Sequence, residues 1–352
     1  MLFKERLLFI GVGQAGGNIT DLFEKKGYNT LYINTSSEDL STLDGDVKKR
    51  YKIPSGTGCS KNKEKAKKYL KKNADGMLKH IESNFVNSDI VFFVFSAGGG
   101  TGAGLSPALL DALSQMNPDK KYGAIMVMPS KKESTICLKN AVGTYADVTA
   151  IQESKSLFVL HNEKGDILQI NKRFTNLFNN FIVSASNADR RGNIDGDEME
   201  TLLTSKGASV IVSLHEDEEG CLTLENDVYP EFTYGCGAIG LSVKSDCEKV
   251  QELLEDTLGI PDVYFNGYID TLNIAFVTEM NYADEMIGEF QEVIKERKEG
   301  KKSGRSGGAV VIKNIFEDEQ PSVESNNKSA NHVVTQKAKK NISTKDLLSK
   351  WS

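Results

Sequence analysis

The sequence of 352 residues has few of the residues that build disulfide frameworks or metal centres. Its five cysteines, at positions 59, 137, 221, 236 and 247, are odd in number and widely spaced, with no Cys-x-x-Cys pair. Its four histidines do not cluster. Reduced thiols in a cytoplasm are the simplest interpretation of this pattern. We therefore expect a cytoplasmic protein and assign no metal-ligating side chains.

Long apolar runs are also missing. No run approaches the ~18–20 residues that span a bilayer, and the first ten residues are too charged for a signal peptide. The net charge of −6 argues against wholesale nucleic-acid binding by the folded body. We expect a soluble body of two domains and an appendage, with no membrane contact and no direct DNA binding by the body.

The most informative stretch is an apolar run followed by a glycine loop. Residues 90–95, IVFFVF, have the length and composition of a strand buried on both faces. Five of the seven residues from Gly98 to Gly104 are glycine, and the apolar residues that follow have helical spacing. Glycine lets a backbone approach a ligand closely, and a helix N-terminus offers free N–H groups. The stretch predicts a phosphate-binding loop rather than a plain glycine turn.

A second glycine loop follows the apolar residues 7–10. Gly11, Gly13 and Gly16 match the dinucleotide fingerprint GxGxxG, which is a weak signal when it stands alone. An NAD enzyme would place an acidic residue at the end of its second strand, to hold a ribose. The expected second strand, 30–33, is followed by Asn-Thr-Ser-Ser, and an acid comes only at Glu38. An NAD-binding Rossmann enzyme therefore stays an alternative from another class.

The loop Ser96–Gly104 resembles the GGGTG(T/S/A)G signature of the tubulin/FtsZ superfamily, and no Gly-Lys-Ser/Thr follows it as in a P-loop. The resemblance extends over roughly residues 5–300. It implies an α/β fold with a Rossmann-like GTP-binding domain (1–170), a central helix (171–192) and a smaller α+β activation domain (193–300). Residues 301–352 are then a linker and a basic, largely disordered tail.

The resemblance also implies a site for GTP or GDP with Mg²⁺. The implied nucleotide-binding residues are Gly11, Gly13, Gln14, Ala15, Asn18, Asn34, Gly58, Gly98, Gly99, Gly100, Thr101, Gly102, Asn162 and Asn180. Asn18 and Asn162 are expected at the guanine, and the loop 55–60 at the γ-phosphate. The family's ribose-contacting pattern is absent from 131–140, so Glu133 and Lys139 are only loose candidates there.

The central helix leaves its guanine contacts open. Phe174 with Asn176, or Phe178 with Asn180, could stack on the base and read its edge. The alternative is that both aromatic side chains belong to the core.

A second motif, Asn193-x-Asp195-x-x-Glu198, has two interpretations. By itself it is a capping box that begins a helix. Through the resemblance, it is the loop that enters the nucleotide site of the next subunit in a filament, where its acids position and activate water. We therefore predict that Asn193, Asp195 and Glu198 are catalytic in trans, and that the chain is a GTP phosphohydrolase that polymerises head to tail.

The departure from the ribose-contacting pattern over 131–140, the acid at Glu198 and the basic tail resemble the features of bacterial tubulins that segregate plasmid or phage DNA. The last sixteen residues hold five lysines and one acid and end in Leu347-Leu-Ser-Lys-Trp351. They are either a solvated end or a docking peptide, and the resemblance implies that a DNA-bound adaptor protein binds them. The alternatives are a cell-division GTPase, a phage spindle tubulin, or a nucleotide-binding regulator that does not polymerise.

Overall fold

The computed structural model describes residues 2–85, 88–185, 189–233, 235–244, 247–269, 273–303 and 344–351. The helix cap expected at Asp246, the last strand expected over 309–316 and most of the basic tail lie outside these residues.

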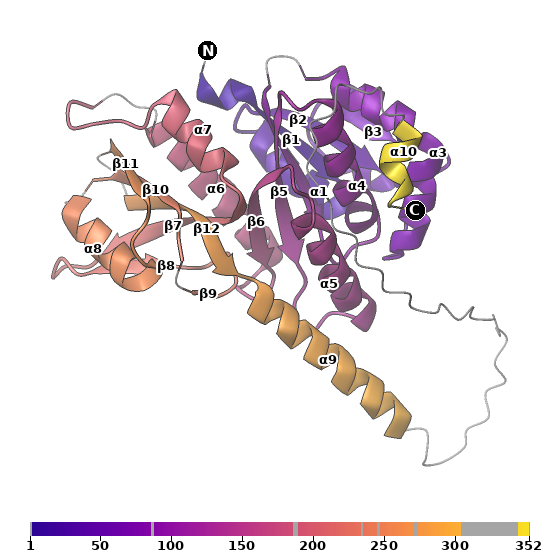
Figure 1. Ribbon diagram of the computed structural model, residues 1–352. Coiled ribbons are helices and arrows are strands. Elements are labelled where there is room, and N and C mark those ends of the chain that lie inside the picture. Colours follow the sequence, from indigo (N-terminus) through magenta and orange to yellow (C-terminus); the bar gives the residue numbers. More distant parts are fainter. Residues whose placement is uncertain are drawn as a thin grey trace, which may run out of the picture.

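The first half of the chain builds a parallel sheet (Figure 1). Its strands are β1 (Leu7–Val12), β2 (Asn29–Asn34), β3 (Arg50–Lys52), β4 (Ile90–Ser96), β5 (Lys121–Met128) and β6 (Ser154–His161). They lie in the order β6-β5-β4-β1-β2-β3, with each neighbouring pair parallel. Every side chain from Ile90 to Phe95 is at most 1% exposed, as expected for a central strand covered on both faces.

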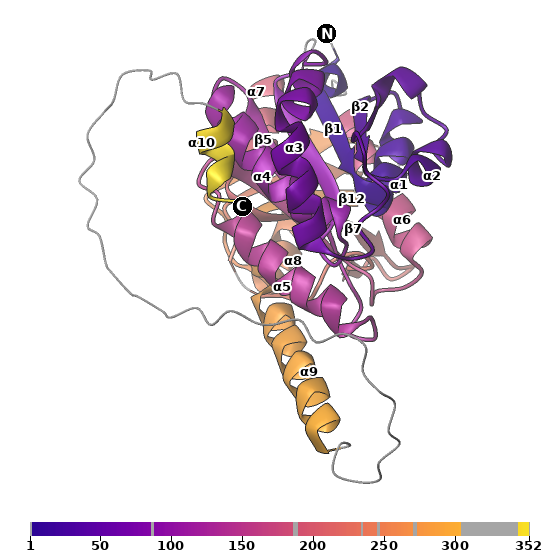
Figure 2. The same cartoon turned by 90° about the vertical axis from the view of Figure 1, so that its right-hand side faces the viewer.

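Helices cover both faces of these strands. They are α1 (Gly13–Glu24), α2 (Ser37–Ser41), α3 (Lys63–Glu82), α4 (Thr101–Met116), α5 (Thr135–Thr149) and α6 (Ile167–Ala185), with 3₁₀ turns η1 (Phe3–Arg6) and η2 (Val47–Lys49). Helices α3, α4 and α5 pack side by side on one face, and α1 packs with α6 on the other (Figure 2). The lysine-rich helix expected over 61–72 is the first half of α3.

The second half of the chain extends the same sheet. Its elements are α7 (Gly196–Thr204), β7 (Gly207–Glu216), β8 (Leu222–Glu225), β9 (Phe232–Thr233), β10 (Ala238–Val243), α8 (Cys247–Leu258), β11 (Val263–Tyr268), β12 (Asn273–Tyr282) and α9 (Asp284–Ser303). Strand β7 joins β6 in parallel, through Ser156 opposite Gly207 and Leu157 opposite Ala208. Antiparallel pairs of β12 with β7 and β10 follow. The predicted α/β class, with a Rossmann-like first part and a smaller α+β second part, is confirmed.

The central helix differs from its predicted bounds of 171–192. Helix α6 begins at Ile167, because the Asp166 carboxylate accepts hydrogen bonds from the backbone N–H groups of Leu168 and Gln169. Its described part ends at Ala185. The N–H of Gly192 donates to the carbonyl of Asp189, so these residues form a turn instead of continuing the helix.

An aromatic cluster between α6 and the elements β1 and α1 contains the two phenylalanines for which the sequence allows a guanine contact. Phe174 and Phe178 are fully buried, and the Phe178 ring makes edge contacts with Phe9 and Phe23. The core alternative is therefore correct for both aromatic rings. Neither is free to stack on a bound base.

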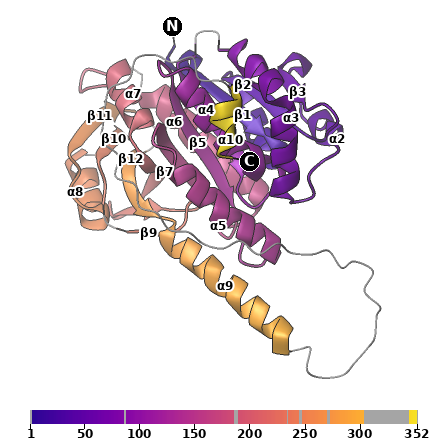
Figure 3. The ribbon, with the colours of Figure 1, turned by 45° about the vertical axis from the view of Figure 1, so that its right-hand side comes forward.

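Helix α9 extends from the body beyond α5, with which its first turns pack (Figure 3). In the described part of the chain, no helix is both long enough and apolar enough to cross a bilayer.

Candidate functional site

A pocket of about 360 Å³ lies where β1 and β4 end and α1 and α4 begin. It brings the two glycine loops together with the segments that follow β2 and β3. Its lining residues are Val12, Gly13, Gln14, Ala15, Ser36, Asp39, Thr57, Gly58, Cys59, Ser60, Lys61, Ser96, Gly99, Gly100, Thr101 and Gly102. The carboxyl ends of neighbouring parallel strands are the usual place for a ligand in such a sheet.

Helices α1 and α4, whose first residues line this pocket, begin without a side-chain cap. The N-cap residues are Val12 for α1 and Gly100 for α4, and neither residue has a side-chain acceptor for the N–H groups of its helix. By contrast, α2, α3, α5 and α7 are capped by Ser36, Asn62, Ser134 and Asp195. Uncapped N-termini leave N–H donors and the positive ends of helix dipoles for an anion. The pocket is thus equipped to bind phosphate.

The glycines of the 98–104 loop have different roles. A Cβ at Gly102 would lie 2.9 Å from the Val12 carbonyl oxygen, and one at Gly100 would lie 2.7 Å from the Cβ of Cys59. At these two positions glycine allows close packing of the protein itself. A Cβ added at Gly99 would have its nearest neighbour, the Ser96 carbonyl oxygen, 3.6 Å away. Gly99 is therefore open toward the pocket.

The loop after β3 holds unusual backbone conformations beside the pocket. Ser55, Ser60 and Lys61 have positive φ angles of 59°, 48° and 63°. Such conformations cost about 1–3 kcal/mol each and are concentrated at functional sites. The strain supports the expectation that this loop contacts the ligand.

Hydrogen bonds of Thr35 and Asn140 join the loops. The hydroxyls of Thr35 and Thr101 lie 2.8 Å apart, which joins the end of β2 to the start of α4. The Asn140 amide donates to the carbonyls of Lys61 (2.8 Å) and Gly99 (3.1 Å), which ties the strained loop to the glycine loop. Sequence reasoning missed Asn140, because only the fold brings α5 to these loops.

Lys61 and Asp39 are further pocket residues that sequence reasoning missed. The Lys61 ammonium donates to the Cys137 sulfur at 2.9 Å, and this hydrogen bond raises the pKa of Lys61 above its ordinary value. The charged lysine therefore lies at the mouth of an anion-binding pocket. The Asp39 carboxylate accepts a hydrogen bond from the Asn34 amide at 3.1 Å.

The predicted residues fall into two groups. Gly13, Gln14, Ala15, Gly58, Gly99, Gly100, Thr101 and Gly102 line the pocket. Gly11, Asn18, Asn34, Gly98, Asn162 and Asn180 are not among its lining residues.

The outlying residues have varied surroundings. Gly11 packs against α1, where a Cβ would lie 2.7 Å from the Thr20 hydroxyl. Asn34 shapes the turn after β2, and Asn180 is exposed on α6. Asn162 carries a buried amide oxygen without a hydrogen-bond partner among the described residues.

The acidic motif forms the capping box that its sequence allows. The Asp195 carboxylate accepts hydrogen bonds from the backbone N–H groups of Asp197 and Glu198, and the Glu198 carboxylate accepts one from the backbone N–H of Asp195, each at 2.9 Å. Buried Ile194 and Met199 anchor the loop. Asn193 and Asp195 are exposed.

This loop and the pocket lie at opposite ends of the sheet. Arg6 directly precedes β1, and its guanidinium pairs with Asp89, which directly precedes β4, and with Glu200 of α7. The middle of α7 is therefore fixed at the ends where β1 and β4 begin, and the acidic loop directly precedes this helix. The pocket lies where these strands end, about 20 Å away for a strand of six residues.

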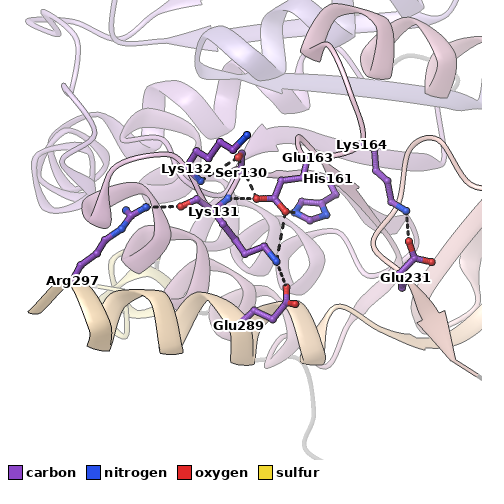
Figure 4. A network of polar contacts seen from close by, with 9 residues as sticks. All are labelled: Ser130, Lys131, Lys132, His161, Glu163, Lys164, Glu231, Glu289 and Arg297. Carbon is purple, nitrogen blue, oxygen red and sulfur yellow. Dashed lines mark hydrogen bonds and ion pairs between the residues drawn. The ribbon is translucent and has the colours of Figure 1, made fainter. Parts of the chain in front are cut away.

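A polar network joins the segment after β5, the end of β6 and helix α9 (Figure 4). Glu163 accepts from the backbone N–H of Lys131 at 2.6 Å, and Lys131 pairs with Glu289 of α9. His161, 7% exposed, packs on the ring of Phe290, with its Nε2 3.9 Å from the Glu163 carboxylate. Burial lowers the pKa of His161, so it is a packed, neutral residue.

The lowered pKa of His161 gives a prediction for stability. The folded state resists protonating this ring, so stability should fall as the pH drops below the ordinary value of about 6.5, by at most ~1.4 kcal/mol per pH unit. Urea unfolding of His161→Gln between about pH 7.5 and 5.5 should show a smaller loss than wild type. His215→Gln, which changes an exposed histidine, is the control. Equal pH dependence in all three proteins would contradict the prediction.

Comparison with known proteins assigns this arrangement to a family. The model of the Tubulin/FtsZ family, GTPase domain, matches residues 6–170. The chain is 30% identical over 360 residues to the tubulin-like protein TubZ of Clostridium botulinum C phage, with 99% of each chain covered. The chain belongs to the tubulin/FtsZ family. It is thus a tubulin/FtsZ-type GTPase, and the predicted superfamily and activity are confirmed.

Other members of the tubulin/FtsZ family share part of the chain or its fold. The tubulin-like protein CetZ of Pyrococcus furiosus is 34% identical over 166 residues, 45% of each chain. The tail-truncated structure of C. botulinum phage c-st TubZ is 30% identical, with a TM-score of 0.75 over 85% of this chain and 99% of that one. A GTPγS-form protofilament of TubZ from Bacillus thuringiensis serovar israelensis, 15% identical, shares the fold with a TM-score of 0.71, over 86% of this chain and 94% of that one.

Proposed function

We propose that this GTPase polymerises head to tail and that each active site is completed by the acidic loop of the neighbouring subunit. One observation carries the proposal: the pocket and the loop with Asn193, Asp195 and Glu198 lie at opposite ends of the same strands. A loop so placed cannot reach the pocket of its own chain. Stacking of subunits along the strand direction brings it to the pocket of the next one.

In this proposal different residues bind the phosphates and the guanosine of GTP. The uncapped N-termini of α1 and α4 bind the phosphates of GTP through N–H donors, with Lys61 as a nearby cation. Mg²⁺, bound with the nucleotide, would neutralise charge on the phosphate oxygens. Asn18, Asn34, Asn162 and Asn180 stay candidates for contacts with the guanosine.

Hydrolysis needs a group that orients the attacking water. Asp39 lies among the lining residues of the pocket itself, where its carboxylate accepts a hydrogen bond from the Asn34 amide. We assign the water to the two acids of the capping box, exposed Asp195 and half-buried Glu198, assisted by Asn193. In this scheme residues 1–170 bind GTP, α6 links the two parts, and residues 193–300 activate hydrolysis in the neighbour.

Electron microscopy tests the assembly. Purified chain with GTP should form filaments and raise light scattering, whereas chain with GDP should stay dispersed, because hydrolysis ends the state that favours assembly. A chain that hydrolyses GTP at the same specific rate at every protein concentration, without polymer, would instead be a non-polymerising regulator.

We further propose that these filaments segregate plasmid or phage DNA in a bacterial cytoplasm, through a TubR-like DNA-bound adaptor that binds the C-terminal tail. The full-length relative that supports this is a phage TubZ. A cell-division GTPase and a phage spindle tubulin remain the alternatives within the family.

A truncation tests the tail. Deletion of residues 317–352 should leave GTP hydrolysis largely intact and abolish co-sedimentation with the adaptor–DNA complex. Salt should weaken the full-length interaction, because the tail is basic. Undiminished binding by the truncated chain would place the adaptor site elsewhere.

A further inference from the structure

The C-terminal tip of the chain lies on the GTP-binding half. Helix α10 (Thr344–Ser349) rests against α3 and α4 (Figures 1 and 3). Leu347 and Leu348 are each 6% exposed and belong to the same apolar cluster as the buried side chains of α3 and α4, with Trp351 packed at its edge. The tip therefore covers apolar surface that these two helices would otherwise expose to water.

A buried carboxylate lies at the centre of this contact. Asp111 of α4 is 1% exposed. Lys350 Nζ lies 2.8 Å from its Oδ2, the Trp351 indole N–H donates to Oδ2 at 2.9 Å, and the Gln115 amide donates to Oδ1 at 2.9 Å. Within the described parts of the chain, the cation that neutralises Asp111 comes from the tip.

The chemistry of the contact is specific. A buried carboxylate is unfavourable unless it is paired and hydrogen-bonded, and charged hydrogen bonds are the strong ones. The tip provides the ammonium of Lys350 and the indole N–H of Trp351, three and four residues after Leu347. These groups reach one carboxylate while the leucines enter the apolar surface between α3 and α4.

We propose that the surface of α3 and α4 around Asp111 is a binding site for a Leu-Leu-x-Lys-Trp peptide, and that its occupant is the chain's own C-terminal tip, bound in cis. Forty positions, 304–343, separate the tip from the end of α9, enough to span at most about 130–140 Å. Because the tip and its site belong to one chain, binding in cis is an intramolecular event that does not depend on protein concentration. While bound, Leu347, Leu348 and Trp351 are withheld from any other protein.

Trp351 is the one tryptophan of the sequence, so its fluorescence reports the tip directly. In the nucleotide-free, full-length chain we expect Trp351 to be protected from acrylamide quenching. Asp111→Asn keeps the shape of the side chain and removes its charge. It should shift the bound-to-released ratio of the tip about 10-fold, the usual effect of losing a hydrogen bond to a charged group. Acrylamide should therefore quench Trp351 fluorescence more strongly in Asp111→Asn than in wild type.

Asp119→Asn is the matched control, because it removes the same charge from an exposed position just after α4. Acrylamide should quench Trp351 fluorescence in this variant as much as in wild type. Equal quenching of Trp351 in the wild-type, Asp111→Asn and Asp119→Asn chains would overturn the proposal.

Dilution separates binding in cis from binding to a second copy. Protection of Trp351 that is constant over about 100-fold dilution supports the intramolecular site, whereas protection lost on dilution overturns it in favour of a second copy.

A peptide assay tests the site in a second way. The Trp351→Ala chain contains no tryptophan, so a synthetic peptide of residues 344–352 can be followed by its own fluorescence anisotropy. It should bind this chain about 10-fold more tightly than the Trp351→Ala, Asp111→Asn chain. Equal affinity for the two would show that Asp111 does not recognise the tip.

Discussion

Glu198→Gln is expected to lower GTP hydrolysis by about 10²–10⁴-fold, the usual effect of losing a positioned acid–base group. Glutamine is the informative replacement because its amide oxygen can still accept the hydrogen bond from the backbone N–H of Asp195. The start of α7 is then preserved and only the charge is lost. The free subunit should bind GTP normally, since Glu198 lies at the far end of the sheet. Filaments should form and persist.

Mixed polymers make this experiment decisive. If Glu198 acts in trans, a small fraction of mutant subunits should slow phosphate release and turnover of the whole polymer, because each mutant disables a neighbour's site. Asp197→Asn removes a charge from an exposed side chain in the same turn and serves as the control. Loss of activity strictly in proportion to the mutant fraction, without long-lived polymer, would contradict catalysis between subunits.

Gly99→Val is expected to weaken GTP binding by about 10–100-fold, the effect of forcing 1–3 kcal/mol of overlap into a filled site. In the protein itself a Cβ at Gly99 meets nothing closer than 3.6 Å, so thermal stability without nucleotide should change little. Gly102→Ala is the contrasting variant, because its Cβ would collide with the Val12 carbonyl and lower stability directly.

Calorimetric titration with GTP and thermal unfolding of the apo protein distinguish the two variants. Unchanged GTP affinity in a folded Gly99→Val chain would remove the 98–104 loop from the phosphate site.

The sequence was sufficient wherever the signal is local. The run from Ile90 to Phe95 became β4, and the glycine-rich loop after it leads into α4 at Thr101 as expected. The capping box at Asp195 was likewise readable, because its two hydrogen bonds join residues three positions apart. Local spacing and side-chain chemistry determine such features without help from the rest of the fold.

Features that depend on packing between distant segments were not predictable in this way. Asn140 reaches the carbonyl of Lys61 across 79 positions, and an asparagine in the middle of a helix carries no such information. The sequence leaves Phe174 and Phe178 compatible with a base-stacking role, whereas in the fold the Phe23 ring packs against both and the Phe9 ring packs against Phe178. The α/β class followed from patterns, whereas the partners of individual side chains required the three-dimensional structure.

In the head-to-tail polymer that we propose, the placement of pocket and acidic loop at opposite ends of β1 and β4 makes the two polymer ends chemically unlike. The last subunit at one end presents a nucleotide pocket that no neighbour's acids complete, so its GTP should outlast the GTP of interior sites. The last subunit at the other end presents unused acids, and its own pocket is already covered. In such a filament GTP hydrolysis is delayed at one end only. The sheet that separates the two surfaces is the source of that polarity.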